Sequence, residues 1–361
     1  MSCSCSCSDS RPSLAMVGLN FGRHIVAQLV EGEGASHVRL AGLCDLDRAK
    51  AEALAAKYAG KTTLKLYDSL DDVLADPAVQ TVGLFTGPVH RADLLRKIIR
   101  AGKDVMTTKP FELDADAATA ILEEAESLGR VIHLNSPNPG ISPDLAQIES
   151  WRETLQLGRP VAARIETFVR YDEKPDGSWY DDPDLCPAPP IFRLGIYLIN
   201  DLVRLMGRVK RVSLFSTRLF TRRPTSDNAQ LALEFENGAL GNVFSSFCVR
   251  DGDHYRNSLE LNFENGTVYR NVGPVRTPGA QCELTVVQAR QREDGELERT
   301  ITATAQTSSR SGGYDWEGFV KAIRHEPGAP RYDIEHVVEP LRVIRAMAEA
   351  ERSGQVVTLP R

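Results

Sequence analysis

Two glycines near the N-terminus follow a short apolar run in the order expected of a loop that binds phosphate. The stretch is Val-Gly-Leu-Asn-Phe-Gly-Arg-His, residues 17–24, so three residues separate Gly18 from Gly22. In the full dinucleotide-binding fingerprint, one glycine permits the tight turn, a second lets the backbone approach pyrophosphate, and a third lets the helix pack on the strand. The middle glycine is missing here. We expect Asn20 to replace it, because asparagine tolerates left-handed backbone better than most residues with a Cβ.

A helix is predicted directly after this loop, because Phe21, Ile25 and Leu29 form an apolar stripe. The positive end of its dipole would face an anion. Asp45 ends the next β-rich run, where an acid accepts hydrogen bonds from the ribose of adenosine. A carboxylate there repels a 2′-phosphate, so NAD is expected rather than NADP, although Arg48 lies close by. A plain turn followed by a surface aspartate is the alternative interpretation.

Lys109 is the clearest candidate for proton chemistry. It ends the fifth β-rich run, in the stretch Asp-Val-Met-Thr-Thr-Lys-Pro-Phe-Glu-Leu-Asp of residues 104–114. The carboxyl ends of strands are where doubly wound sheets bind ligands, and Pro110 disfavours helical backbone at the lysine. A desolvated lysine has a lowered pKa and can donate or accept a proton or orient a hydroxyl. Considered alone, a solvated loop lysine is the simpler interpretation.

The elements that would position these residues alternate between strand and helix over the first 135 residues. Runs rich in β-formers lie at 14–18, 38–45, 63–67, 79–86, 104–108 and 130–135. Helical patterns fill 21–31, 47–58, 89–101 and 114–128, and a shorter one at 69–74 has Ser69 as its cap. This alternation predicts an α/β fold with a doubly wound parallel sheet. We therefore expect a Rossmann dinucleotide-binding domain over residues 14–136, after a disordered tail of residues 1–13.

The pattern changes where prolines and a glycine cluster at residues 137–143. A helix (143–157), a long strand (161–171) and a second helix (194–206) are predicted next. Further β-rich runs lie at 209–220, 229–236, 239–249, 258–264, 267–270, 283–291 and 297–304. Glu-Asn-Gly recurs at 236–238 and 264–266, as turns between consecutive strands do. With helices at 314–325 and 333–353, residues 137–361 predict a C-terminal α+β domain with a large, mostly antiparallel sheet, for substrate binding and oligomerisation.

Composition excludes several other classes of protein. The chain has 361 residues, 42% of them hydrophobic and 25% charged, which is enough for two domains. A net charge of −6 gives no general attraction to nucleic acid or anionic membranes. No apolar run approaches the roughly 18 residues that span a bilayer. The N-terminus lacks the basic and apolar regions of a secretion signal, so we expect a cytoplasmic protein.

Neither the cysteines nor the histidines suggest a disulfide framework or a metal centre. Four cysteines are scattered singly: Cys44, Cys186, Cys248 and Cys282. Three others alternate with serine in the tail: Cys3, Cys5 and Cys7. A soft-metal site in that tail lacks a fourth ligand, so disorder is favoured there. The seven histidines show no metal-binding spacing, and we expect no metal.

Four stretches of the chain resemble the Gfo/Idh/MocA oxidoreductases, and they occur in the family's order. Residues 106–114 resemble its Glu-Lys-Pro element, with Thr108 in place of the usual glutamate. Residues 84–105 resemble its Thr-Pro…His segment with the helix and strand that follow. Residues 179–207 resemble its second signature, Asp-x-Gly-x-His/Tyr-x-x-Asp/Asn after an Asp-Pro loop, and residues 346–360 resemble its ending. The resemblance spans nearly the whole chain and implies a nicotinamide-dependent oxidoreductase.

Carried over by position, the resemblance implies that Lys109 is the catalytic lysine. Tyr197 matches a position that is histidine in inositol dehydrogenase-like members and tyrosine in glucose–fructose oxidoreductase-like members. Asn200 matches the Asp/Asn three residues later. On a regular helix Arg193, Tyr197 and Asn200 share one face, at i, i+4 and i+7. Lys109 and Tyr197 would then handle a proton while hydride moves to or from nicotinamide.

The remaining binding residues follow from the same motifs. The expected cofactor-binding residues are Gly18, Asn20, Phe21, Gly22, Asp45, Thr86, Gly87, Pro88, His90 and Lys109. The expected substrate-binding residues are Arg193, Asn200, His90 and Tyr171.

Arg193 departs from the family, which has an aspartate at this position. A guanidinium matches a carboxylate or phosphate of a ligand, so an anionic substrate such as a sugar acid is favoured. The alternative is an ion pair with an acid of the preceding loop: Asp181, Asp182 or Asp184.

The function that the resemblance implies for these residues is NAD(H)-dependent hydride transfer to or from the carbinol or carbonyl of a sugar, sugar acid, cyclitol or related polyhydroxy compound. A tightly bound NAD that is recycled in epimerisation, elimination or glycoside cleavage is one alternative. A non-catalytic, dinucleotide-binding regulator is the other. We also expect a homo-oligomer, dimer or tetramer, because an antiparallel sheet must cover or solvate its second face. Nucleic-acid and membrane partners are not expected.

Overall fold

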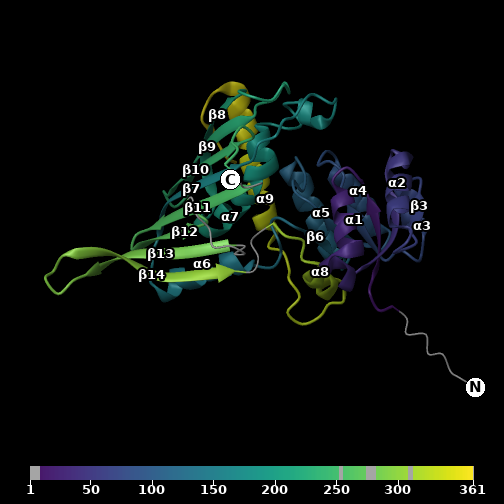
Figure 1. Ribbon diagram of the computed structural model, residues 1–361, viewed down its shortest axis with the longest axis horizontal. Coiled ribbons are helices and arrows are strands. Elements are labelled where there is room, and N and C mark those ends of the chain that lie inside the picture. Colours follow the sequence, from purple (N-terminus) through teal and green to yellow (C-terminus); the bar gives the residue numbers. More distant parts are fainter. Residues whose placement is uncertain (1–8, 252–254, 274–281, 308–311, 361) are drawn as a thin grey trace, which may run out of the picture. The chain divides into compact units, whose positions relative to one another are not determined.

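Two β-sheets organise the protein, one in each of the two units into which the chain divides (Figure 1). The computed structural model describes residues 9–251, 255–273, 282–307 and 312–360. The first unit comprises residues 1–108, 120–134 and 314–331, and the second comprises residues 109–119, 135–313 and 332–361. The predicted tail with its three cysteines falls mostly on residues 1–8, outside the described residues.

The first unit contains a six-stranded parallel sheet in the order β3-β2-β1-β4-β5-β6. Its strands are β1 (Ser13–Val17), β2 (Arg39–Cys44), β3 (Lys65–Tyr67), β4 (Thr81–Leu84), β5 (Asp104–Thr107) and β6 (Ile132–Leu134). The strands β1, β4 and β5 are buried along their whole length, as parallel strands covered on both faces must be. The order reverses between β1 and β4, which is where doubly wound sheets bind ligands. The predicted parallel, doubly wound fold is confirmed.

Among the described residues of this unit, helices connect the strands: α1 (Gly22–Glu31), α2 (Arg48–Tyr58), α3 (Leu70–Ala75), α4 (Arg91–Arg100) and α5 (Ala115–Ser127). A short 3-10 turn, η1 (Glu33–Ser36), follows α1. The predicted cap of α3 is present, because the hydroxyl of Ser69 accepts a hydrogen bond of 3.1 Å from the N–H of Asp72. The last residues of α5 belong to the first unit and its first residues to the second.

A further helix of the first unit comes from far along the chain. This is α8 (Trp316–Ile323), which lies within the segment 314–331. Its Trp316 and Phe319 are part of the same buried cluster as Leu29 of α1. Gly34 makes room for it, since a Cβ at that position would lie 3.1 Å from the Trp316 ring. The sequence analysis expected a single domain boundary at residue 136. In the structure, the first unit also includes residues 314–331, and residues 109–119 belong to the second unit.

The second unit is built on a nine-stranded sheet in the order β14-β13-β12-β11-β7-β10-β9-β8-β15 (Figure 1). The strands are β7 (Pro160–Phe168), β8 (Val209–Thr217), β9 (Asn228–Phe235), β10 (Leu240–Ser246), β11 (Arg256–Phe263), β12 (Gly266–Arg270), β13 (Cys282–Gln291), β14 (Leu297–Thr307) and β15 (Val357–Thr358). Neighbouring strands are antiparallel except β7 and β10, which are parallel. The predicted Glu-Asn-Gly stretches join β9 to β10 and β11 to β12. A large, mostly antiparallel sheet is thus confirmed.

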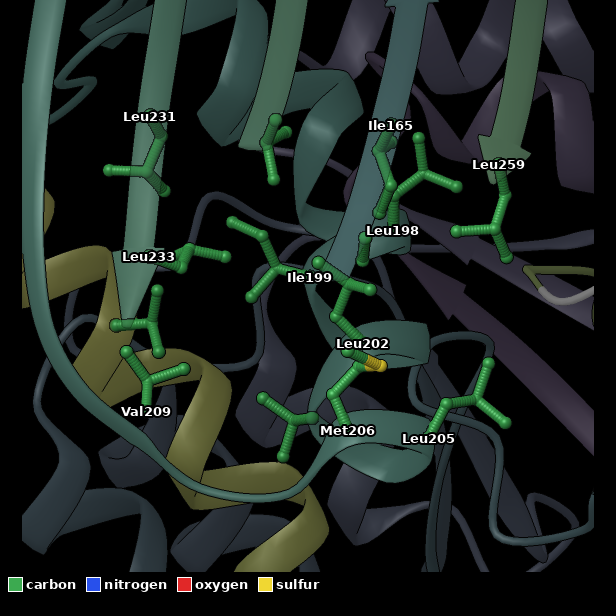
Figure 2. Close-up of a cluster of buried hydrophobic side chains, with 14 of the residues drawn as sticks. Ile165, Leu198, Ile199, Leu202, Leu205, Met206, Val209, Leu231, Leu233 and Leu259 are labelled. Atoms are coloured by element: carbon green, nitrogen blue, oxygen red, sulfur yellow. The ribbon is translucent and has the colours of Figure 1, made fainter. Parts of the chain in front are cut away.

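Helices α6 (Pro143–Thr154), α7 (Ile196–Met206) and α9 (Ile334–Ser353) provide the apolar side chains that bury one face of this sheet. Along β9, buried and more exposed residues alternate, as a strand with one covered face requires. Figure 2 shows Leu198 of α7 beside Ile165 of β7, and Ile199 of α7 between Ile165 and Leu233 of β9, all within one buried cluster. A five-residue π-helical segment, η3 (Ile191–Gly195), leads directly into α7. Among the described residues, no helix is both long and apolar enough to cross a membrane.

Candidate active site

The glycine loop turns tightly against the end of β4. Gly18 has a φ of +87°, and a Cβ there would lie 2.9 Å from the carbonyl carbon and oxygen of Phe85. Only glycine fits without strain, because the conformation is left-handed and the space is already filled by backbone. The expectation that Asn20 takes a left-handed conformation is wrong. Its φ is not positive, and its side-chain oxygen instead accepts a hydrogen bond of 2.9 Å from Lys50.

The N-terminus of α1 is open to an anion. No side chain caps its first turn, whereas Asp47 caps α2 and Ser69 caps α3. The ring of Phe21 is 47% exposed at this turn, and a Cβ on Gly22 would make only an ordinary contact of 3.4 Å with Met16. An uncapped helix start after a tight turn offers N–H groups and a positive dipole end to a phosphate. This geometry fits the pyrophosphate of a dinucleotide.

Asp45 is held against the same loop. One carboxylate oxygen accepts a hydrogen bond of 2.6 Å from the N–H of Leu19, and the other accepts one of 2.9 Å from Asp47. Each carboxylate oxygen can accept a further hydrogen bond, so the group remains able to bind ribose hydroxyls. Arg48, the nearby cation, is already paired with Glu52 at 3.0 Å and with Asp68.

A buried arginine that the sequence analysis did not single out braces the ends of β4 and β5. Arg91 is 1% exposed, and its guanidinium donates to the carbonyl of Thr86 and, at 2.5 Å, to that of Thr108. The hydroxyl of Thr108 accepts a hydrogen bond of 2.8 Å from Tyr314. The exposed His90 has a left-handed backbone with a φ of +53° at the start of α4. The other predicted cofactor residues of this loop are Thr86, Gly87 and Pro88.

Lys109 and Tyr197 come together in the second unit. The Nζ of Lys109 donates a hydrogen bond to the main-chain carbonyl of Arg193 and lies 4.6 Å from the centre of the Tyr197 ring. The buried side chain of Asn135 joins the two residues, because its oxygen accepts from the N–H of Lys109 at 3.1 Å. Its nitrogen lies 3.4 Å from the Tyr197 hydroxyl and 3.1 Å from the carbonyl of Gly312. A lysine amine and a phenol this close can together donate one proton, or accept one once either group is deprotonated.

Asn135 was missed by the sequence analysis. Its only local signal was a polar side chain directly after the β6 strand, at the edge of the sheet where ligands bind. Gly312 packs against the ring of Tyr197. A larger residue would not fit there, since a Cβ at this position would lie 2.8 Å from the ring.

Asn200 of α7 contacts the residues that follow β6. Its amide nitrogen donates a hydrogen bond of 2.7 Å to the hydroxyl of Ser136. Within the part of the chain that the structure describes, its buried amide oxygen has no hydrogen-bond partner. The spacing from Arg193 assumed a regular α-helix, whereas Arg193 lies in the π-helical segment that precedes α7. Its predicted role in substrate binding stays a prediction.

The side chain of Arg193 forms an ion pair inside the protein. It donates two hydrogen bonds, of 2.8 and 2.7 Å, to the carboxylate of Glu173. The guanidinium carbon lies 4.0 Å from the ring centre of Tyr180, 4.8 Å from that of Phe247 and 5.2 Å from that of Tyr171. The ion-pair partner of Arg193 is thus Glu173 rather than one of the three aspartates considered from the sequence. The loop after β7 carries this glutamate to the guanidinium.

Electrostatics around this pair favour the charged state of the glutamate. Burial opposes ionisation of Glu173, but hydrogen bonds from Arg193 and the charges of Arg193 and Arg223 outweigh it, so its pKa lies below the ordinary value. Burial, together with a hydrogen bond of 2.9 Å between its hydroxyl and that of Tyr255, raises the pKa of Tyr171. Tyr171 is therefore a neutral group beside the ion pair.

A cavity of about 740 Å³ lies elsewhere in the second unit. It is lined by residues of β8, α9 and the loop before η3, including Ser216, Arg218, Arg345 and Glu351. None of the predicted site residues lines it. Among the described residues, no group of three or more histidine, cysteine, aspartate or glutamate side chains is placed to hold a metal ion.

Comparison with protein families agrees with this fold. Residues 13–136 match the oxidoreductase family with an NAD-binding Rossmann fold, and residues 145–269 match the GFO/IDH/MocA C-terminal domain. Together the matches span more than half of the chain. The chain therefore belongs to the Gfo/Idh/MocA family of oxidoreductases, and it is an enzyme with an NAD-binding Rossmann domain.

Individual relatives are distant. D-xylose 1-dehydrogenase (NADP(+)) 2 of Haloferax volcanii is 26% identical over 336 residues, which covers 92% of this chain and 96% of that protein. Inositol 2-dehydrogenase/D-chiro-inositol 3-dehydrogenase of Lactiplantibacillus plantarum is 22% identical over 298 residues, covering 80% and 82%. The solved structure of levoglucosan dehydrogenase with NADH and levoglucosan has a TM-score of 0.73 at 15% identity, covering 97% of this chain and 99% of that one. At that identity the likeness shows the fold.

Proposed function

We propose that the protein is an NAD(H)-dependent dehydrogenase that oxidises a CH–OH group of a neutral sugar or cyclitol, or reduces the corresponding carbonyl. The observation that carries the proposal is the arrangement of Lys109 and Tyr197 around Asn135. The Nζ of the lysine and the ring of the tyrosine are 4.6 Å apart, and the amide of Asn135 contacts both residues. The names of the two curated relatives, a xylose and an inositol dehydrogenase, support this class of substrate.

In this proposal Lys109 and Tyr197 manage the proton of the reacting hydroxyl. A bound nicotinamide dinucleotide supplies the hydride acceptor or donor. During oxidation the pair accepts the proton of the substrate hydroxyl after it has lost one proton of its own, either as phenolate with ammonium or as phenol with neutral amine. During reduction the fully protonated pair donates that proton to the new hydroxyl. Asn135 donates toward the phenol oxygen of Tyr197 and so helps to fix the position of this hydroxyl. The carbonyl of Arg193 keeps the ammonium in place.

The cofactor proposed is NAD rather than NADP. Asp45 lies where the adenosine ribose would bind and would repel a 2′-phosphate. Arg48, the cation that would otherwise attract this phosphate, is paired with Glu52 and Asp68. Gly18, Gly22, Phe21 and Asp45 are the residues proposed to hold the dinucleotide.

The proposed substrate is neutral, because both terminal nitrogens of the Arg193 guanidinium already donate to Glu173. An anionic ligand would have to displace a paired, largely buried carboxylate. The ratio of kcat/KM for D-glucose and D-glucuronate measures this preference. A protein that uses D-glucuronate better would restore the anionic substrate that the sequence suggested.

The experiment for the proposed function follows NADH absorbance while the enzyme is offered NAD and D-xylose, myo-inositol or levoglucosan. Net NADH formation with one equivalent of carbonyl product supports the proposal. Product without net NADH would indicate a redox-neutral cycle with recycled cofactor. NADH binding without any product would favour a non-catalytic regulator.

We further propose that the open face of the nine-stranded sheet joins copies of this chain into a dimer or tetramer. Phe215 of β8 and Leu240 of β10 are 78% and 59% exposed, and the strand register places them on the same face. Exposed apolar side chains on a broad sheet mark an interaction surface. Light scattering after gel filtration should give a multiple of the chain mass, and Phe215→Glu should lower it. A monomeric wild-type protein would contradict this proposal.

A further inference from the structure

The position of the Lys109 ammonium depends on the backbone of residue 193. Its Nζ donates to the carbonyl of Arg193, and a main-chain carbonyl moves only with its own residue. That residue lies in the π-helical segment Ile191–Gly195. Such segments are short and occur often at functional sites. The position of the Lys109 ammonium therefore depends on the conformation of the π-helical segment Ile191–Gly195.

The side chain of Arg193 attaches this segment to a separate loop. Both of its terminal nitrogens donate to Glu173, at 2.8 and 2.7 Å, and its guanidinium lies over the ring of Tyr180. The side chain is only 13% exposed. A two-point contact with a carboxylate fixes orientation as well as distance. The segment is thus fastened to the loop that follows β7.

Glu173 is itself held on its other side. Arg223, between β8 and β9, donates to it at 2.9 Å, and the side chain of Arg223 is 7% exposed. Two further acids hold Arg223, Asp176 at 3.0 Å and Asp181 at 2.6 Å. The glutamate therefore stands between two arginines that come from different parts of the second unit.

We propose that Glu173 is a positioning residue for Lys109. Through the side chain of Arg193, it fixes the carbonyl that holds the ammonium beside Tyr197. The inference rests on the proposed function, because the position of Lys109 affects turnover only if this lysine handles the substrate proton. It also explains why an arginine can stand where the family resemblance placed an aspartate, since the acid comes from a separate loop.

Loss of the glutamate charge would disturb this arrangement. The guanidinium of Arg193 would remain largely buried beside the aromatic rings without a charged acceptor, and an unpaired buried charge is strongly unfavourable. The arginine would turn toward water, and the short π-helical segment would shift with it. The ammonium of Lys109 would then lose the main-chain carbonyl of Arg193 as a hydrogen-bond acceptor.

The test measures the pKa of the Lys109 amine directly in the apo protein. The amine competes for a small amount of acetic anhydride at a series of pH values, and peptide mass spectrometry gives the labelled fraction. Trypsin does not cleave a Lys–Pro bond, so labelled and unlabelled Lys109 stay in one peptide. The thiol of Cys186 does not interfere, because burial raises its pKa to about 12, although the charges of Arg193 and Lys109 lower it.

Two variants separate positioning from simple charge effects. Glu173→Gln removes a negative charge, and Arg193→Ala removes a positive one. On electrostatic grounds alone the first lowers and the second raises the pKa of a neighbouring amine. Positioning predicts that both lower it, by about half a unit or more, because an ammonium that loses its acceptor is less stable. An unchanged or raised pKa in Arg193→Ala overturns the proposal, and this variant decides the matter if Glu173→Gln does not fold.

A matched control lies in α7, which directly follows η3. Arg204 of α7 pairs with Glu149 at 2.9 Å, so Glu149→Gln loses an arginine–glutamate contact that lies further along the chain from Arg193. It should leave the Lys109 pKa unchanged, and an equal shift in this control also overturns the proposal.

Turnover provides the second measurement, with NAD and the sugar that gave the best rate. Glu173→Gln should lower kcat by about 10-fold while the Kd for NADH stays the same. If Lys109→Met keeps wild-type turnover while Arg193→Ala still lowers the Lys109 pKa, the proposed function fails and the positioning stands. If Lys109→Met is inactive while Glu173→Gln has wild-type kcat and Arg193→Ala has a wild-type Lys109 pKa, only the positioning fails.

Discussion

The carboxylate of Asp45 accepts a hydrogen bond of 2.6 Å from the backbone N–H of Leu19. This contact joins the end of β2 to the glycine loop, two parts of the site that are separate in the sequence. The loop and the acid therefore keep a fixed spacing before any ligand binds, and preorganisation of this kind reduces the entropy lost on binding.

Replacement of Asp45 by alanine should weaken NADH binding by about 10-fold or more, since a charged acceptor for two hydroxyls is lost. Fluorescence titration of NADH measures the Kd. Asp47→Asn is the matched control, because it removes one charge nearby and keeps a residue that caps α2 well. An Asp45→Ala protein with the wild-type Kd for NADH, or a wild type that binds NADPH more tightly, would show that the ribose site is elsewhere.

Gly18→Ala should both destabilise the protein and abolish NADH binding. A Cβ in left-handed backbone costs about 1–2 kcal/mol, and at this position it also meets the backbone of Phe85 at 2.9 Å. Gly102→Ala separates the two effects, since Gly102 has a φ of +76° but nothing within 4 Å of its Cβ position. Urea unfolding should show a larger loss for Gly18→Ala. Equal losses with intact NADH binding in both variants would contradict the account of the loop.

The sequence predicted the strands and helices well because their periodicity is strong. Each of the six parallel strands was expected, and the end of the fifth placed Lys109 at the edge where ligands bind. The position of α8 was not predicted, because an apolar stripe such as that of Trp316 and Phe319 shows that a helix face is buried but not what covers it.

The contacts that organise the candidate site could not be predicted from the sequence either. Asn135 joins Lys109 to Tyr197, and Glu173 binds Arg193, yet each pair is separated by a stretch of chain with its own local pattern. Periodicity reports only on neighbours in the sequence. The face expected to join Arg193 to Tyr197 and Asn200 assumed a regular α-helix, whereas Arg193 lies in a π-helical segment, which changes which residues share a face.

His133 of β6 should make the stability of the first unit depend on pH. Burial lowers the pKa of this histidine from 6.5 to about 3, so it stays neutral in the folded protein while the unfolded chain takes up a proton below 6.5. Stability is therefore complete above that value and falls as the pH drops towards 3, by about 2 kcal/mol between pH ~7.5 and ~5. Denaturant unfolding at these two pH values measures the loss.

His133→Leu should remove most of this dependence, whereas His24→Gln, which changes an exposed histidine, should keep it. A His133→Leu protein that loses as much stability on acidification as the wild type would mean that other groups are responsible.

The central claim is that Lys109 and Tyr197 handle the substrate proton, and the most direct measurement is the turnover of Lys109→Met and Tyr197→Phe with NAD and the best sugar of the panel. Both should lose about 10²-fold or more in kcat with an unchanged Kd for NADH. Lys103→Met is the control, because Lys103 precedes β5 and donates to the carbonyls of Asp76 and Val79, at 2.9 and 2.6 Å. It should lose stability but keep its turnover per folded molecule. Near-native turnover in both Lys109→Met and Tyr197→Phe would contradict the account and place the active site elsewhere.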